Sequence, residues 1–158
     1  MDAQQLLDHI IKPTLEYMGG NYDSKNARML LLSTAAIESK CGYYVKQVGG
    51  PALGIWQMEP TTEADMWLNC DYLQAEKDSV LNLIAKDGFI HELIAYPSYA
   101  CAMARLKYSM DSAPLPQYDN IRAVYDYYKR VYNTPLGAST YEKFKQAWLY
   151  HELNEVKL

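Results

Sequence analysis

The sequence lacks the cysteine and hydrophobic patterns that several protein classes require. Its three cysteines, Cys41, Cys70 and Cys101, are odd in number and lie about thirty residues apart, which matches neither a CxxC metal pair nor a disulfide framework. We therefore expect reduced thiols in the core, and no metal or other cofactor. No run of eighteen apolar residues occurs, because charged residues or prolines interrupt each apolar stretch. We therefore expect no stable insertion into a membrane.

The sequence also lacks an excess of basic charge, and its first residues lack the features of a signal peptide. Fifteen Lys and Arg residues oppose nineteen Asp and Glu residues, which gives a net charge of -4 and a pI near 5.3. Such a balance offers little attraction to a phosphate backbone, so no nucleic-acid partner is expected. The N-terminal segment has scattered charges and no small-residue cleavage site. We expect synthesis in the cytoplasm without a signal peptide.

Phenylalanine is scarce, whereas tyrosine is abundant: two Phe stand against fifteen Tyr and three Trp. Amphipathic rings suit a surface that both stacks and hydrogen-bonds, such as a sugar-binding cleft. Packing in the core explains most tyrosines in any protein, so this bias alone does not decide a function.

Hydrophobic periodicity predicts a mainly α, α+β lysozyme-like domain that covers residues 1–158. The segment that contains residues 29–37 is the most apolar, so we expect its helix to be buried at the centre. Residues 41–60 hold four glycines and two prolines, which predicts a loop or small β-hairpin. Capping residues and apolar spacing predict about seven helices. Their starts are expected near Asp2, Asp23 or Ser24, Thr61 or Thr62 (with Asp65 in a capping box), residue 75 (ending at Gly88), Pro97, Asp119 or Asn120, and Ser139.

Glu38 is the first candidate for chemistry, because it continues an apolar stripe on the central helix. Ala27, Leu31 and Ala35 follow at four-residue steps, and Glu38 comes three residues later on the same side. An apolar setting and the negative end of the helix dipole both raise the pKa of a carboxyl group. A general acid near neutral pH needs such a pKa. The alternative is that the helix frays and Glu38 is an ordinary solvated residue.

Three blocks between Ile37 and Asn133 resemble the signature of soluble lytic transglycosylases and goose-type lysozymes. They are Glu38-Ser39, then Gly54-Ile55-Trp56-Gln57 followed by Pro60-Thr61, and finally Val131-Tyr132-Asn133. In these families a Glu-Ser pair closes a buried helix, and a glycine-containing loop leads to a Gln and a Pro-Thr helix start. The last block departs from the family's Ala-Tyr-Asn, because Val131 replaces the alanine.

The resemblance implies a role for each matching residue. Glu38 would protonate the β-1,4 bond between N-acetylmuramic acid and N-acetylglucosamine in the glycan strands of peptidoglycan, and Gln57 would hydrogen-bond the substrate. Tyr132 would orient Glu38 or contact the sugar, and it could equally be a packing residue at a helix end. Ser39 would steady the loop or touch a muramyl substituent.

Two further matching residues have a structural alternative. Gly54 would let the glycan approach the backbone, or it is a plain turn glycine. Trp56, like Tyr43 or Tyr44 nearby, is a possible stacking platform for a sugar ring, or a packing side chain.

The number of carboxyl groups decides between a lyase and a hydrolase. Hydrolysis usually uses two, whereas a lytic transglycosylase, as the resemblance implies, uses one and closes a 1,6-anhydro ring on the muramyl residue. Glu59, Glu63 and Asp65 lie on or just after the loop that we expect to line the cleft. Glu59 stands where the transglycosylase pattern has an apolar residue. It would either activate water, as in a muramidase, or stabilise the start of the next helix.

Functions without catalysis remain open as well. A lysozyme-fold module could bind glycan, or serve as a structural part of a bacteriophage, without cutting the strand; a helical scaffold would leave Glu38 exposed and form no cleft. The small size and the signature suggest a phage lysin or a virion-associated wall enzyme that acts on the host cell wall. Delivery would then need a holin or a tail structure.

Overall fold

The computed structural model describes residues 1–84, 90–133 and 137–158, and these are mainly helical. The predicted end of one helix at Gly88 lies outside the described residues. Each helix predicted from periodicity is present, and the single turn α6 is added to them. The elements are α1 Ala3–Leu6, a π-helical turn Leu7–Ile11, α2 Lys12–Met18, α3 Lys25–Ser39, α4 Pro60–Asn69, a 3₁₀ turn Asp71–Leu73, α5 Gln74–Leu81, α6 Glu92–Ala95, α7 Pro97–Ser109, α8 Ile121–Tyr128, a second π-helical turn Lys129–Asn133, and α9 Tyr141–Tyr150.

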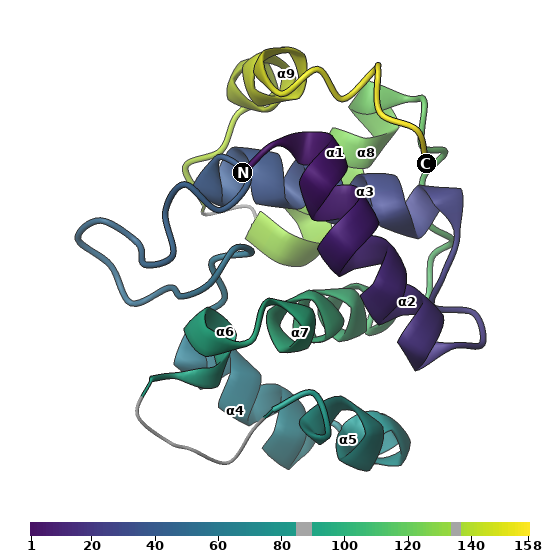
Figure 1. Cartoon of the computed structure of the whole chain (residues 1–158), viewed down its shortest axis with the longest axis vertical. Helices are drawn as coiled ribbons and strands as arrows, with labels where there is room; N and C mark the ends of the chain where they lie inside the picture. The colour runs from purple at the N-terminus through teal and green to yellow at the C-terminus, as the bar shows by residue number, and fades with distance from the viewer. Residues whose placement is uncertain (85–89, 134–136) are drawn as a thin grey trace.

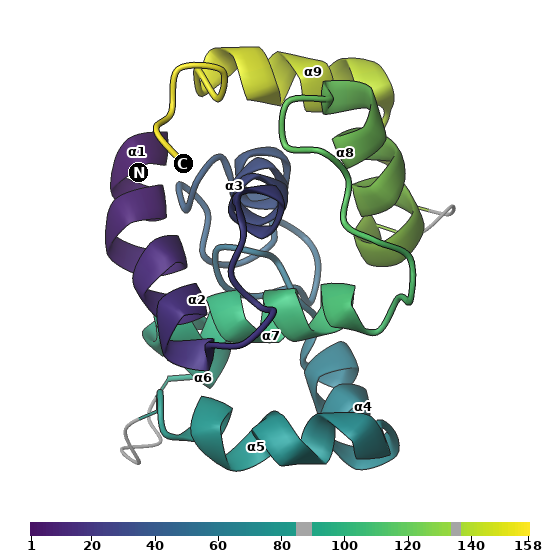
Figure 2. The ribbon, with the colours of Figure 1, turned by 90° about the vertical axis from the view of Figure 1, so that its right-hand side faces the viewer.

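Helix α3 is the centre of the fold, as its apolar sequence predicted. Ser24 caps its first turn by accepting a hydrogen bond from the backbone N–H of Ala27, 3.1 Å away. Side chains on all sides of the helix are buried, including Leu30, Leu31 and Leu32. Viewed nearly along its axis, α3 is surrounded by α1–α2, α7, α8 and α9 (Figure 2). The last turn of this buried rod is therefore held from several directions.

The N-terminal helices form one continuous rod despite Pro13. Proline has no N–H to donate and its ring crowds the preceding turn, which usually kinks or breaks a helix. Here the turn before Pro13 widens into the π-helix Leu7–Ile11, and the N–H of Lys12 donates to the carbonyl oxygen of Leu7. The widened turn keeps the chain helical until Gly19, whose φ of +67° ends it.

Residues 41–59 form a loop, and the described residues contain no β-strand. Two isolated antiparallel bridges stand in place of the predicted hairpin, Lys46 with Leu53 and Leu53 with Met58. The backbones of Leu53 and Met58 exchange hydrogen bonds of 2.9 and 3.0 Å. This pair closes a tight turn over residues 54–57. In Figure 1 the loop extends to one side of α3 and returns towards α4.

Helices α4 and α5 form a layer beneath α7, and the single turn α6 lies beside the start of α7 (Figure 1). The predicted capping box of Thr62 and Asp65 is wrong: α4 begins at Pro60 with Glu59 at the N-cap position, and Asp65 instead accepts a hydrogen bond from Asn69. Proline fixes the φ angle that the first helical residue needs, so it sets the start. None of the described helices is both long and apolar enough to cross a bilayer.

Helix α9 covers the opposite side of α3 from α7, and its start also differs by one residue from the prediction. Thr140, not Ser139, accepts the capping hydrogen bond, from the backbone N–H of Lys143. The buried side chains Phe144 and Trp148 face the core. The three cysteines are buried free thiols, as predicted.

Candidate active site

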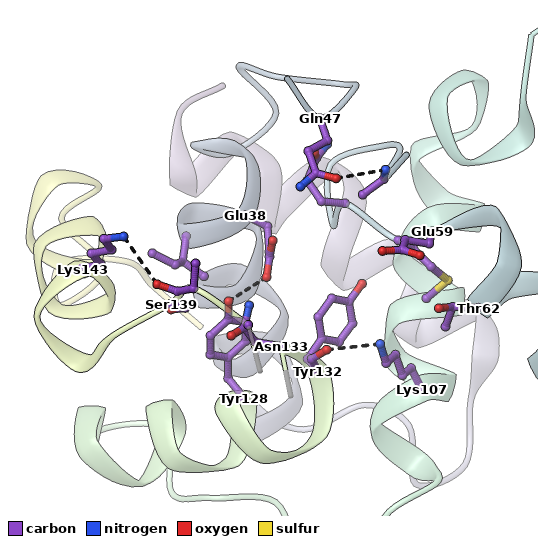
Figure 3. A pocket seen from close by; sticks show the side chains of 16 residues that line it. Glu38, Gln47, Glu59, Thr62, Lys107, Tyr128, Tyr132, Asn133, Ser139 and Lys143 are labelled. Carbon is purple, nitrogen blue, oxygen red and sulfur yellow. Dashed lines mark hydrogen bonds between the residues drawn. The ribbon is translucent and has the colours of Figure 1, made fainter. Parts of the chain in front are cut away.

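Glu38 lies in the last turn of α3 and is half-buried at the wall of a cleft of about 550 Å³. The helix does not fray before it. Its backbone continues to Ser39, and Lys40 ends it in a left-handed conformation with φ +52°. The alternative that Glu38 is an ordinary solvated residue is therefore wrong. The carboxyl group is held at the boundary between the core and an open hollow (Figure 3).

Tyr128, at the end of α8, holds the carboxyl group. Its hydroxyl donates to Oε1 of Glu38 over 2.6 Å, and the side chain of Asn133 also hydrogen-bonds Glu38. Burial raises the pKa of Glu38 above its ordinary value, while these two hydrogen bonds and the charge of Lys107 oppose the rise. Glu38 thus has a raised pKa and a fixed orientation, the two properties that a proton donor needs.

The cleft separates the end of α3, α8 and the second π-helical turn from the loop 47–59 and the start of α4. Figure 3 shows Glu38 and Tyr128 on one side, with Glu59 and Thr62 on the other. Polar groups dominate the lining, which suits a ligand rich in hydroxyl and amide groups. Its polar members are Glu38, Gln47, Gln57, Glu59, Thr62, Lys107, Tyr128, Tyr132, Asn133, Ser139 and Lys143.

Tyr132 does not orient Glu38, so that part of the prediction is wrong. Its buried hydroxyl donates to the carbonyl oxygen of Trp56 over 3.0 Å, and the bond to Glu38 comes from Tyr128 instead. The two tyrosines are four residues apart and their rings are almost parallel, with centroids separated by 6.4 Å. The chain between them enters a π-helical turn, in which side chains four residues apart no longer superimpose. Tyr132 still lines the cleft, so contact with a sugar remains a prediction.

Ser39 steadies the loop. Its side chain is fully buried, its hydroxyl donates to the carbonyl oxygen of Ala35, and its Oγ accepts the backbone N–H of Gly42 over 2.8 Å. Direct contact with a muramyl substituent does not fit this burial. Ser39 therefore fixes the start of the loop that follows Glu38.

Gln57 lines the cleft, where the sequence placed it. Its backbone adopts φ +48°, and its Nε2 donates to the carbonyl oxygen of Gly54 over 2.7 Å. The turn closed by Leu53 and Met58 fixes this position. Within the described residues the side-chain oxygen of Gln57 has no hydrogen-bond partner, so it can accept a hydrogen bond from a ligand.

Trp56 and Gly54 belong to the core and not to the surface of the cleft, so the predicted substrate contacts are wrong and the structural alternatives hold. The Trp56 ring is 1% exposed and its Nε1 donates to the carbonyl oxygen of Leu31, so no sugar can stack on it. Gly54 is buried with φ +74°, and a β-carbon there would lie 2.1 Å from the carbonyl oxygen of Leu93. Glycine is required at this position because the backbone of α6 approaches it so closely.

The three candidates for a second carboxylate have different surroundings. Glu59 is exposed at the cleft and accepts a hydrogen bond from Thr61, 3.3 Å away. Glu63 is buried between α4 and α7, where the Tyr99 hydroxyl donates to it over 2.5 Å, and burial raises its pKa. Asp65 accepts from Asn69 and does not line this cleft. Of these three, Glu59 alone lines the same cleft as Glu38.

Tyr128 and Lys107 are the site residues that the sequence reasoning missed. Tyr128 lies on the same helical segment as Tyr132, one four-residue step earlier, and that spacing was the available signal. The Lys107 ammonium donates to the Tyr132 carbonyl oxygen over 3.2 Å and lies 4.4 Å from the centre of its ring. Burial lowers the pKa of Lys107, and the charges of Glu38 and Glu59 oppose that change.

Comparisons with family models, with curated proteins and with solved structures gave no match for this chain.

Proposed function

We propose that this chain cleaves the β-1,4 bond between N-acetylmuramic acid and N-acetylglucosamine in peptidoglycan, as a lytic transglycosylase with Glu38 as general acid and then general base. One observation carries the proposal. Glu38 is a half-buried carboxyl group with a raised pKa, held by Tyr128 at the wall of a cleft of about 550 Å³. The resemblance of the blocks around Glu38, Gln57 and Tyr132 to the transglycosylase signature supplies the substrate.

The proton moves in two steps. The protonated Glu38 gives its proton to the glycosidic oxygen, the bond from C1 of the muramyl residue to that oxygen breaks, and N-acetylglucosamine leaves with a free hydroxyl. The resulting carboxylate removes the proton from the C6 hydroxyl of the muramyl residue while that oxygen bonds to C1. Glu38 is then protonated again and no water is consumed. Tyr128 supports the carboxylate that exists between the two steps.

The alternative is a muramidase, and the exposed Glu59 carboxylate favours it. Glu59 lies on the opposite wall of the cleft from Glu38 (Figure 3). A water molecule between the two groups would add to C1 instead of the C6 hydroxyl. We place this second because a transglycosylase needs only Glu38, which has the buried setting that raises the pKa of a carboxyl group. A third possibility is glycan binding without cleavage, which predicts no change in sacculi.

Two matched substitutions test the proposal. Glu38→Gln keeps the shape and removes the transferable proton, so activity on purified sacculi should fall by about two to four orders of magnitude with unchanged circular dichroism. Glu59→Gln makes the same chemical change on the other wall and should keep most of the activity.

Mass spectrometry of the wild-type products identifies the reaction. Anhydro-muropeptides are one water lighter than hydrolysed ones, so their presence supports the transglycosylase. Products that carry the extra water, together with an inactive Glu59→Gln variant, would establish the muramidase instead. Intact sacculi after treatment with the wild-type protein would end both enzymatic proposals.

A further inference from the structure

The cleft continues into a groove that the proposed chemistry does not use. Two further hollows, of about 480 and 470 Å³, follow the cleft along the ends of α3 and α9. The first shares Ile37 and Lys143 with the cleft. The second shares Lys40 and Tyr150 with the first. We call this surface the stem groove, and its cationic and aromatic side chains include Lys40, Tyr43, Tyr44, Lys143, Tyr150 and His151.

The stem groove is basic, although the protein as a whole is acidic. Lys40 and Lys143 are exposed there, and among the described residues no Asp or Glu lines either hollow. The chain carries a net charge of -4, so a stretch without acidic side chains stands out locally. Burial lowers the pKa of His151, which keeps its ring neutral at pH 7 and able to accept a hydrogen bond.

Large aromatic rings are exposed in the same groove. Tyr43 is 74% exposed and Tyr150 is 78% exposed, far more than the core tyrosines. Tyr43 and Tyr44 pack edge to face, and the Lys40 ammonium lies 5.7 Å from the centre of the Tyr44 ring. Lys40 also occupies the left-handed position where a helix normally ends with glycine. A long cationic side chain is thus present at a position where glycine would avoid the backbone strain.

We propose that the stem groove binds the acidic peptide stem of the muramyl residue whose bond is cut in the cleft. This inference rests on the proposed function for the position of that residue. The stem is attached to the muramyl lactyl group and carries free carboxylates, which the two lysines match in charge. Neutral sugars would not need those lysines. Figure 3 shows Lys143 on the α9 side of Glu38, where the cleft passes into the groove.

Two soluble ligands test the groove: the disaccharide N-acetylglucosaminyl-N-acetylmuramic acid with a tetrapeptide stem, and the same disaccharide without it. Neither contains the bond that the cleft would cut, so the intact wild-type chain can be used in calorimetry. We expect the wild type to bind the stem-bearing ligand more tightly. Lys40→Glu should lower the affinity for the stem-bearing ligand about tenfold, and Lys40→Gln about threefold. The affinity for the stem-free ligand should stay unchanged.

The control is Lys145→Glu, which makes the same charge change at an exposed position of α9 outside the groove. It should leave both affinities unchanged. An equal loss of affinity for both ligands in Lys40→Glu would overturn the proposal, since the groove would then bind sugar. Equal wild-type affinity for the two ligands would also overturn it. So would a dimer seen by sedimentation that Lys40→Glu dissociates, because a second copy of the chain would then be the occupant.

The groove and the enzymatic activity can fail separately. A preference for the stem-bearing ligand that depends on Lys40, combined with sacculi that stay intact, would support the groove proposal and refute the proposed function. Cleavage of sacculi that depends on Glu38, without any preference for the stem-bearing ligand, would refute the groove proposal and support the proposed function.

Discussion

Gly54→Ala tests whether the turn that presents Gln57 depends on the close approach of α6. The new β-carbon would lie 2.1 Å from the carbonyl oxygen of Leu93, which is backbone and cannot swing aside. Two penalties add: about 1–2 kcal/mol for an L-residue in the left-handed region, and about 1–3 kcal/mol for forcing an extra group into a packed interior. Alanine also lowers the conformational entropy of the unfolded chain, which stabilises the folded protein by about 0.4–1 kcal/mol and offsets part of these penalties.

Gly49→Ala supplies the matched control for that prediction. Gly49 has φ +73°, almost the same as the +74° of Gly54, but a β-carbon there meets nothing within 4 Å. Both variants share the backbone penalty and the effect on the unfolded chain. The difference between them, about 1–3 kcal/mol, therefore isolates the overlap with Leu93. In a protein of this size it corresponds to about 2–12 °C in Tm.

Urea unfolding followed by circular dichroism measures both variants. Gly54→Ala should have the lower midpoint, and its activity should fall even where it is folded, because the turn that carries Gln57 must move. Equal midpoints for Gly54→Ala and Gly49→Ala would refute the argument. The contact between the turn and α6 would then be too loose to fix the position of Gln57.

Two further predictions concern Glu38. Tyr128→Phe removes the hydroxyl that donates to Glu38 over 2.6 Å. A hydrogen bond to a charged group contributes about 1.5–3 kcal/mol, so rates on sacculi should fall about 10- to 100-fold. Because this hydrogen bond lowers the pKa of Glu38, its loss should move the alkaline limb of the pH–rate profile to higher pH. An unchanged profile would contradict the role given to Tyr128. Glu38→Gln should gain stability relative to the wild type as pH rises. Burial raises the pKa of Glu38, so its contribution to stability is complete below the ordinary glutamate value and is lost as pH rises through the raised value. Urea midpoints near pH 4 and pH 8 measure this difference, and an equal gap at both would mean that Glu38 ionises as freely as in the unfolded chain.

Apolar periodicity was enough to predict the helices and the central position of α3. It also placed Glu38 correctly, because the stripe from Ala27 to Ala35 is buried and Glu38 continues it to the edge of the core. Helix starts were less certain, since neighbouring residues can cap equally well. Thr140 caps α9 one residue after the predicted Ser139. A difference of one residue in a cap changes little in the fold.

Contacts across the core were not readable from the sequence. Trp56 could be a stacking platform or a packing side chain, and the choice depends on whether α3 covers it. The structure places its Nε1 against the Leu31 carbonyl oxygen, and the ring is buried. Gly54 is a similar case, because its requirement comes from Leu93, thirty-nine residues later in the chain. Neither partner has a local signature in the sequence.

The larger departure from the expected site comes from the π-helical turn Lys129–Asn133. An α-helical period predicts that Tyr128 and Tyr132 share one face and one neighbour. The wider turn separates their targets, so Tyr128 reaches Glu38 while Tyr132 reaches the backbone of Trp56. Both walls of the cleft are thereby fixed from one segment: Tyr128 fixes the Glu38 carboxyl group, and Tyr132 fixes the loop that carries Gln57. Wide turns of this kind are rare in helices and often occur at functional sites. This turn accordingly gives a physical reason to look for chemistry at the Glu38 cleft that is independent of the sequence resemblance.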